Sequence, residues 1–239
     1  MVLQVGEIHP TSKCGNIVVT EYRSAKDVTV RFIDTGTEVV TATKEVRSGA
    51  IRDPLARTVF GVGYLDGCKG YSNNKASSNY VRWFGMLARC YDKYTKEVQP
   101  TYQQCTASES FKSFALFEEW AISSIGSDNP KWHLDKDILV KGNKVYSEDT
   151  CCFVPREINN LFVLRTNDRG SHPIGVNKSS DIFYARMMRD GKYRHIGQYD
   201  TSEEAFYAYK EAKEKHIKEV ANKWKGQIDI RVYNALMSW

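Results

Sequence analysis

The sequence predicts an α+β protein built from several small domains. Segments rich in β-branched residues lie near the N-terminus, amphipathic helical segments lie in the middle, and a strand-strand-helix pattern lies near the C-terminus. Stretches rich in Gly, Ser and Asn or in charged turn residues separate these regions. The chain has 239 residues, enough for one large domain or two to three small ones, and its hydrophobic content of 41% is sufficient for packed cores.

Residues 1–66 are expected to form a small β domain. NIVVTEY (16–22) and DVTVRFI (27–33) are separated by a hairpin-length turn, and TEVVTAT (37–43) continues as a third strand. In the second strand Val28, Val30 and Phe32 alternate with more polar residues, which gives the strand one apolar face. A twisted sheet or SH3-like barrel is therefore predicted.

A linker at residues 66–79 precedes a helical pattern at residues 80–94. One stripe of this helix is aromatic and apolar: Trp83, Leu87, Cys90, Tyr91 and Tyr94. Arg82 and Arg89 lie seven residues apart on another side and are candidate DNA contacts. The spacing of Thr106 and Glu109 is that of a capping box, which predicts the start of a second helix with an aromatic buried side.

Residues 133–160, HLDKDILVKGNKVYSEDTCCFVPREINN, have the order strand, turn, strand, Pro-started helix. The acids of LDKD end the first strand, and GNK (142–144) forms the turn. This order is typical of a ββα-metal nuclease site, which holds one divalent cation beside the scissile phosphate and a base that activates water. Asp135 and either Asn159 or Asn160 are the expected metal ligands.

The residues offer three candidates for the base of such a site. Lys136 stands where a histidine is expected, and the middle asparagine position falls near residues 148–150, which contain no Asn. Lys136, Asp137 and His133 are the candidates for proton transfer; strand alternation puts His133 on the same side as Asp135. The alternative interpretation is a surface β-turn-β with acids at its tip.

Residues 175–220 predict two or three strands and a helix. DIFYARMMR (181–189) alternates, Asp190-Gly191 is a strong hairpin turn, and KYRHIGQY (192–199) forms the next strand. Thr201 and Glu204 have capping-box spacing, and small residues in the following helix would let it sit close on a sheet.

This segment resembles the Apetala-type DNA-binding domain of plant ethylene-response factors over roughly 50 residues. The resemblance rests on Gly175-Val176, Tyr184-Ala185-Arg186, Gly191-Lys192, Ile196-Gly197-Gln198-Tyr199, Thr201, Glu203-Glu204-Ala205 and Ala208-Tyr209 with Ala212. It implies a domain at residues 173–224 in which a three-stranded sheet, backed by one helix, lies in the DNA major groove. The implied DNA contacts are Lys178, Arg186, Tyr193, Arg194 and His195.

Residues 80–164 resemble the HNH-type (ββα-metal) homing endonucleases of phages and mobile elements. The resemblance is carried by WFGMLARC (83–90), the aromatic-rich segment 111–120, LDKD (134–137), Gly142-Asn143, Tyr146, Cys151 and Ile158-Asn159-Asn160. With the C-terminal Apetala-type segment it covers about residues 80–220. It implies cleavage or nicking of double-stranded DNA with Mg²⁺ or Mn²⁺. Two alternatives stay open: a non-catalytic DNA-binding protein that keeps the fold, and a phage accessory protein whose β domain docks a host protein.

Net charge, cysteine spacing and hydropathy limit the possible partners and cellular location of the protein. The net charge of +5 permits a polyanionic partner, and six cysteines without a C-x-x-C pair predict buried, reduced thiols. No apolar run approaches 18 residues, so we expect neither a membrane span nor a secretory signal but a cytoplasmic protein. The C-terminal residues 225–239 are apolar enough to pack on one of the domains.

Overall fold

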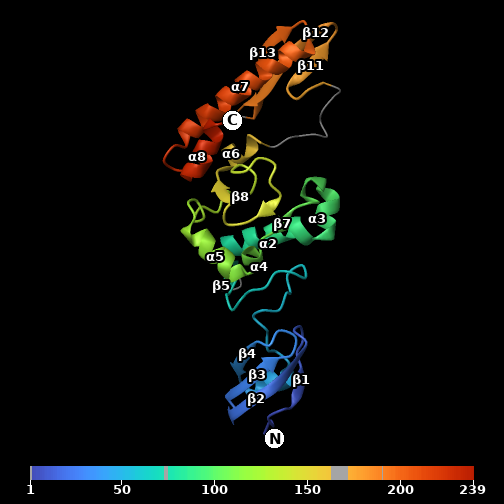
Figure 1. Cartoon of the computed structure of the whole chain (residues 1–239), viewed down its shortest axis with the longest axis vertical. Coiled ribbons are helices and arrows are strands. Elements are labelled where there is room, and N and C mark those ends of the chain that lie inside the picture. The colour runs from blue at the N-terminus through green and yellow to red at the C-terminus, as the bar shows by residue number, and fades with distance from the viewer. Residues whose placement is uncertain (1, 73–74, 163–171, 190) are drawn as a thin grey trace. The chain divides into compact units, whose positions relative to one another are not determined.

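The computed structural model describes residues 2–72, 75–162, 172–189 and 191–239 (Figure 1). These residues form a mixed α and β structure with one four-stranded, one three-stranded and three two-stranded sheets. The mixture of helices and small sheets predicted from the sequence is therefore confirmed. The linker at residues 165–173 and the turn residue Asp190 lie wholly or partly outside the described residues.

The chain divides into two compact units, which cut across the predicted segments. One comprises Met1–Ser123 and Lys144–Asp149; the other comprises Ser124–Asn143 and Thr150–Trp239. The predicted 80–164 region thus contributes to both units, because the chain leaves the second unit at residue 144 and re-enters it at residue 150.

In the first unit an antiparallel sheet has the order β1 (Ile8–Pro10), β2 (Asn16–Ser24), β3 (Asp27–Phe32) and β4 (Glu38–Thr41). Val28, Val30 and Phe32 are fully buried, as the alternation predicts, and they share a core with Ile17 and Val46. Val46 lies on the short helix α1 (Thr43–Ser48), which was not predicted. Among the described residues this sheet is a meander in sequence order.

The helical part of the first unit also carries four small strands among its described residues. Its elements are β5 (Tyr71–Ser72), β6 (Lys75–Ala76), α2 (Ser78–Tyr91), α3 (Lys93–Val98), the 3₁₀ turn η1 (Pro100–Tyr102), β7 (Thr106–Ala107), α4 (Glu109–Lys112), α5 (Phe114–Ser123) and β9 (Val145–Tyr146). Trp83, Leu87 and Cys90 are buried as predicted. Tyr94 is 73% exposed, so its place on that stripe was wrong; the chain turns at Asp92, which ends α2 and caps α3.

The second predicted helix begins two residues later than expected. Thr106 lies in β7, which pairs in parallel with β9, and the hydroxyl of Ser108 caps α4 by accepting from the backbone N–H of Phe111. The helix is interrupted at Ser113. Its predicted buried side is confirmed, since Phe111, Phe114, Phe117 and Ala121 are all fully buried.

The second unit begins with the strand-loop-strand-helix segment. β8 (His133–Asp135) pairs antiparallel with β10 (Cys152–Val154), with Asp135 opposite Cys152 and His133 opposite Val154. Pro155 leads directly into α6 (Arg156–Asn160). Cys152, Val154 and Ile158 point into a common core, so the hairpin and the short helix form one packed motif.

A three-stranded antiparallel sheet follows, with the order β11 (Val176–Ser179), β12 (Ile182–Arg189) and β13 (Lys192–Tyr199). The long helix α7 (Ser202–Lys223) starts with the predicted capping box of Thr201 and Glu204. Ala205 of α7 packs against Val176 and Ala185 of the sheet. A side chain at Gly175 (φ +79°) would overlap the ring of Tyr209, which explains the need for glycine where β11 meets α7.

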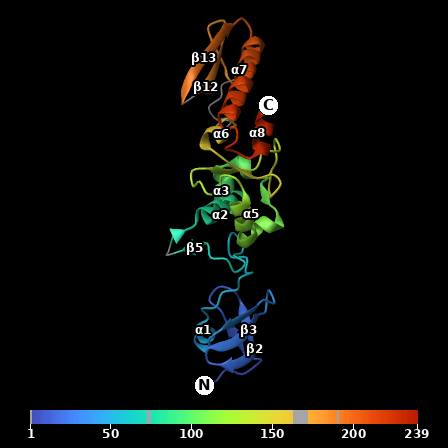
Figure 2. The ribbon, with the colours of Figure 1, turned by 90° about the vertical axis from the view of Figure 1, so that its left-hand side faces the viewer.

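α7 belongs to two cores. Its first turns cover the sheet, and its later residues Ile217, Val220 and Ala221 complete the core of the hairpin and α6. The C-terminal helix α8 (Ile230–Met237) adds Val232 and Leu236 to the same core. Figure 2 shows the sheet along one side of the first part of α7, and α6 and α8 near its other end.

All six cysteines are free thiols, and four of them are buried. Among the helices in the described parts of the chain, none is long and apolar enough to cross a lipid bilayer.

Candidate functional site

Asp135 lies at the last position of β8, half-buried, where the chain turns away from the hairpin. Its Oδ1 accepts hydrogen bonds from the backbone N–H groups of Asp137 and Ile138, both at 2.8 Å. Burial, followed by the nearby carboxylate of Asp137, raises the pKa of Asp135 to about 6. The Asp135 carboxylate thus stabilises the turn through two hydrogen bonds and is repelled by the negative charge of Asp137.

Lys136 is buried, with its Nζ 3.1 Å from Oδ2 of Asp137. The carboxylate of Asp137 is therefore engaged by an adjacent ammonium. The two side chains therefore contact each other, and His133 is the candidate base that lies outside this ion pair.

Asn143 holds the loop that follows β8. Its side-chain Nδ2 donates to the backbone carbonyl of Lys136 at 2.7 Å, across seven residues. From the sequence, residues 142–144 were predicted only as a turn, with no role for Asn143. The Gly-Asn pair is the sequence signal for this loop-closing residue, since Gly142 (φ +79°) turns the backbone and places the Asn143 amide beside the loop.

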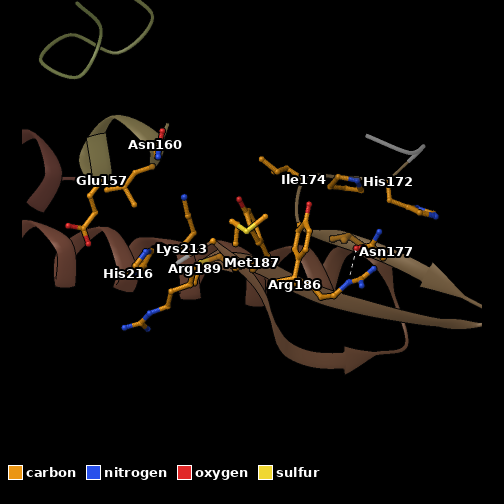
Figure 3. Close-up of a pocket in the computed structure, with 18 of the residues that line it drawn as sticks. Glu157, Asn160, His172, Ile174, Asn177, Arg186, Met187, Arg189, Lys213 and His216 are labelled. Carbon is orange, nitrogen blue, oxygen red and sulfur yellow. Dashed lines mark hydrogen bonds between the residues drawn. The ribbon is translucent and has the colours of Figure 1, made fainter. Parts of the chain in front are cut away.

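His133 is exposed at the start of β8, and its Nδ1 lies 3.3 Å from Nδ2 of Asn159 on α6. Because side chains two residues apart lie on the same side of a strand, His133 and Asp135 share one side of β8. Asn160 instead lines a cavity on the other side of α6 (Figure 3). The two asparagines that the sequence left as alternatives thus point to different places, and Asn159 is the one beside the hairpin.

The metal-ligand set has few acidic members. Within the described residues, no group of three or more His, Cys, Asp or Glu side chains converges on one point. Beside Asp135 lies the carboxylate of Asp137, and the Asn159 amide lies against His133, on the same side of β8. Mg²⁺ characteristically takes one or two carboxylates and completes its shell with water and substrate phosphate, so this donor set is compatible with such an ion.

The strand register separates the candidate DNA contacts of the sheet into two faces. Arg186 is opposite His195 and Met188 is opposite Tyr193, and these side chains lie on the face turned away from α7. Arg194 is opposite Met187, and Lys178 is opposite Phe183, so these two cations belong to the α7-packed face although both are exposed. A bulge between Ala185 and Arg186 produces this arrangement.

The two arginines of α2 are both engaged in local contacts. Arg82 donates to Oδ1 of Asn79 at 3.0 Å. Arg89 donates to the hydroxyl of Tyr146 at 3.0 Å, and its guanidinium stacks over the rings of Tyr102 and Tyr146. Arg89 therefore ties α2 to β9 and η1, a structural use that the sequence pattern did not indicate.

Comparison with known protein families, with curated proteins and with solved structures finds no match to this chain.

Proposed function

We propose that this protein is a metal-dependent DNA endonuclease or nickase that binds duplex DNA through its C-terminal sheet. The observation that carries the proposal is the packed hairpin and helix of residues 133–160. It sets Asp135 at the end of a strand, with His133 on the same side and Asn159 against that histidine. This is the order of elements that the resemblance to HNH-type proteins implies.

Asp135 and Asn159 would hold Mg²⁺ or Mn²⁺. A bound divalent cation would polarise the phosphate and promote ionisation of a water molecule. Burial, and after it the neighbouring carboxylate of Asp137, raises the pKa of Asp135, and a bound cation would stabilise the ionised carboxylate against both effects.

His133 is the proton acceptor that the geometry favours. Lys136 and Asp137 neutralise each other, whereas the His133 ring is exposed. In the observed orientation Nδ2 of Asn159 donates to Nδ1 of His133, which puts the proton of the neutral ring on Nε2. Rotation of the Asn159 amide by 180° would let its oxygen accept from Nδ1–H and would leave Nε2 the lone pair that takes a proton from water. Asn143 then acts as a positioning residue, since it fixes the carbonyl of the residue that follows Asp135.

The outer face of the sheet would contact the DNA. Arg186, Tyr193 and His195 project from two adjacent strands, and a strand pair fits the major groove. Arg186 also donates to Oδ1 of Asn177 at 3.1 Å, which orients its guanidinium on this face. The N-terminal β domain (residues 1–66), for which the sequence predicts a twisted sheet or an SH3-like barrel, has no role in this proposal.

A second candidate, a DNA-binding protein without nuclease activity, is favoured by one observation. Lys136 supplies a positive charge directly beside Asp137, in the place where the resemblance implies a histidine. That internal cation partly satisfies the carboxylates that would otherwise attract a metal ion.

The test is a nicking assay on supercoiled plasmid with Mg²⁺, Mn²⁺ or EDTA. Asp135→Asn keeps an oxygen that accepts from residues 137 and 138 but removes the charge, so it should fold normally and lose nicking. Asp128→Asn, at an exposed acid outside residues 133–160, is the matched control and should retain activity. Wild-type protein that binds duplex DNA but does not nick with either metal would decide for the second candidate.

A further inference from the structure

The inward-facing side of α7 changes character halfway along the helix. Ala205 and Tyr209 pack on the sheet, and Ile217, Val220 and Ala221 pack on the hairpin core. Between these two apolar segments the helix carries Lys213, four residues after Tyr209 and four before Ile217. Residues at this spacing lie on one side of a helix, so a lysine interrupts an otherwise apolar stripe.

Lys213 faces a cavity of about 650 Å³. Figure 3 shows its amine directed between α6, which carries Asn160, and the segment of Ile174 that leads into β11. Met187 and the ring of Tyr209 contribute apolar surface. The cavity is large enough for a small ligand, and most of its lining is polar or charged, which suits a charged ligand.

The charges in the cavity favour an anion. Lys213 is half-buried, and within the described part of the chain its ammonium has no hydrogen-bond or ion-pair partner; burial lowers its pKa. Arg156 of α6, together with Arg186 and Arg189 of β12, adds further cations at the cavity wall. Glu157 is the acid among the described lining residues, and its carboxylate is already bound by Lys223 at 2.7 Å and by the indole N–H of Trp224 at 2.8 Å.

We propose that this cavity binds one nucleotide unit of a DNA strand, with a phosphate on Lys213 and Arg156 and the base against Tyr209 and Met187. The inference rests on the proposed function, because it is the neighbouring sheet and hairpin that make DNA the source of the phosphate. A free nucleotide offers the same chemistry and is the alternative source.

The experiment measures binding of a fluorescein-labelled 12-nucleotide oligothymidylate and of a 20-base-pair duplex by anisotropy over a salt series, and of dTMP by calorimetry. Lys213→Met keeps the length of the side chain and removes its charge. It should weaken oligonucleotide binding about fivefold or more and reduce the salt slope by about one. Lys215→Met, an exposed lysine on the same helix, is the matched control with an expected change below about twofold.

Arg156→Gln provides a second variant at an exposed position, where loss of folding is not expected, and it should weaken binding in the same direction. Equal effects of Lys213→Met and Lys215→Met, with Arg156→Gln silent, would overturn the inference. Binding of dTMP that depends on Lys213, with unchanged oligonucleotide affinity, would overturn the assignment to a DNA strand and identify a free nucleotide.

The two proposals fail in different ways. If His195→Ala, on the outer face and outside the cavity lining, weakens duplex binding but Lys213→Met does not, the cavity inference is wrong and DNA binding by the sheet stands. If His195→Ala leaves duplex affinity unchanged and the wild-type protein nicks with neither metal, while Lys213→Met still weakens oligonucleotide binding, the cavity site stands and the proposed function is wrong.

Discussion

The side-chain amide of Asn143 donates a hydrogen bond to the backbone carbonyl of Lys136 at 2.7 Å. Together with the two backbone N–H groups held by Asp135, this bond closes the loop between β8 and residue 143 on itself. The position of Asp135 therefore depends on a residue eight positions further along the chain.

Replacing Asn143 should disturb this loop without touching the sheet. Asn143→Asp removes the N–H donor and places a carboxylate beside a carbonyl, so we expect a loss of about 1–2 kcal/mol in the free energy of unfolding. If the proposed site is correct, nicking should fall while duplex affinity stays unchanged. Urea denaturation and plasmid nicking measure the two effects, and Asn234→Asp, at an exposed position on α8, is the control.

The stability of the metal-free protein should depend on the ionisation of Asp135. Its pKa in the folded state, about 6, lies above the ordinary value of 3.8, so between these values the folded protein binds more protons than the unfolded chain. The stabilisation is present at low pH and is lost as pH rises through about 6. Asp135→Asn should remove this loss and increase stability at pH 8 by on the order of 1–2 kcal/mol.

Comparing Asp135→Ala with Asp135→Asn distinguishes the effect of the Asp135 charge from the effect of its hydrogen bonds to the turn. Alanine also removes the buried charge but leaves the N–H groups of Asp137 and Ile138 without their acceptor, so this variant should be less stable than Asp135→Asn. Urea titrations in EDTA at pH 4.5, 6 and 8 measure the difference. A wild-type stability that does not fall between pH 4.5 and 8 relative to Asp135→Asn would contradict the raised pKa.

Arg89 should contribute to stability rather than to DNA affinity. Arg89→Met keeps much of the side-chain volume but loses the bond to the Tyr146 hydroxyl and the stacking on Tyr102, which together predict a loss of about 2 kcal/mol. Thermal denaturation measures it. Duplex affinity reduced tenfold with unchanged melting temperature would instead support the DNA contact predicted from the sequence.

Two variants that each remove one positive charge test which face of the sheet contacts DNA. Arg186→Ala removes a cation from the outer face, and Arg194→Ala removes one from the face shared with α7. We expect the first to weaken duplex binding by about 1–3 kcal/mol and the second to have a smaller effect. Anisotropy at two salt concentrations distinguishes them; equal losses would mean that net charge, and not the face, determines binding.

Local patterns were sufficient to predict much of the fold. Alternation correctly placed Val28, Val30 and Phe32 in a core, and capping spacing correctly started the helix at Thr201. The start of the helix near Thr106 was placed too early, because that residue pairs with β9, nearly 40 positions away, and no local signal encodes such a partner.

The site was harder to predict than the fold. Simple alternation gave no face for Tyr193 and Arg194, because the bulge beside Arg186 shifts the pairing by one residue. The cavity around Lys213 went unnoticed because it forms where two cores meet on one helix, and each core is assembled from distant segments. A lysine on an apolar stripe was the available signal.

α7 also limits how this protein can be divided or exchanged. A fragment that ends before Ser202 would lose Ile217, Val220 and Ala221, and the hairpin of residues 133–154 would be left with an open apolar side. A fragment that starts at Val176 would keep the sheet but carry that same apolar surface of α7 into water. The hairpin core and the sheet core are therefore expected to unfold together. A domain swap that replaces the sheet must also keep the second half of α7, because that half completes the hairpin core.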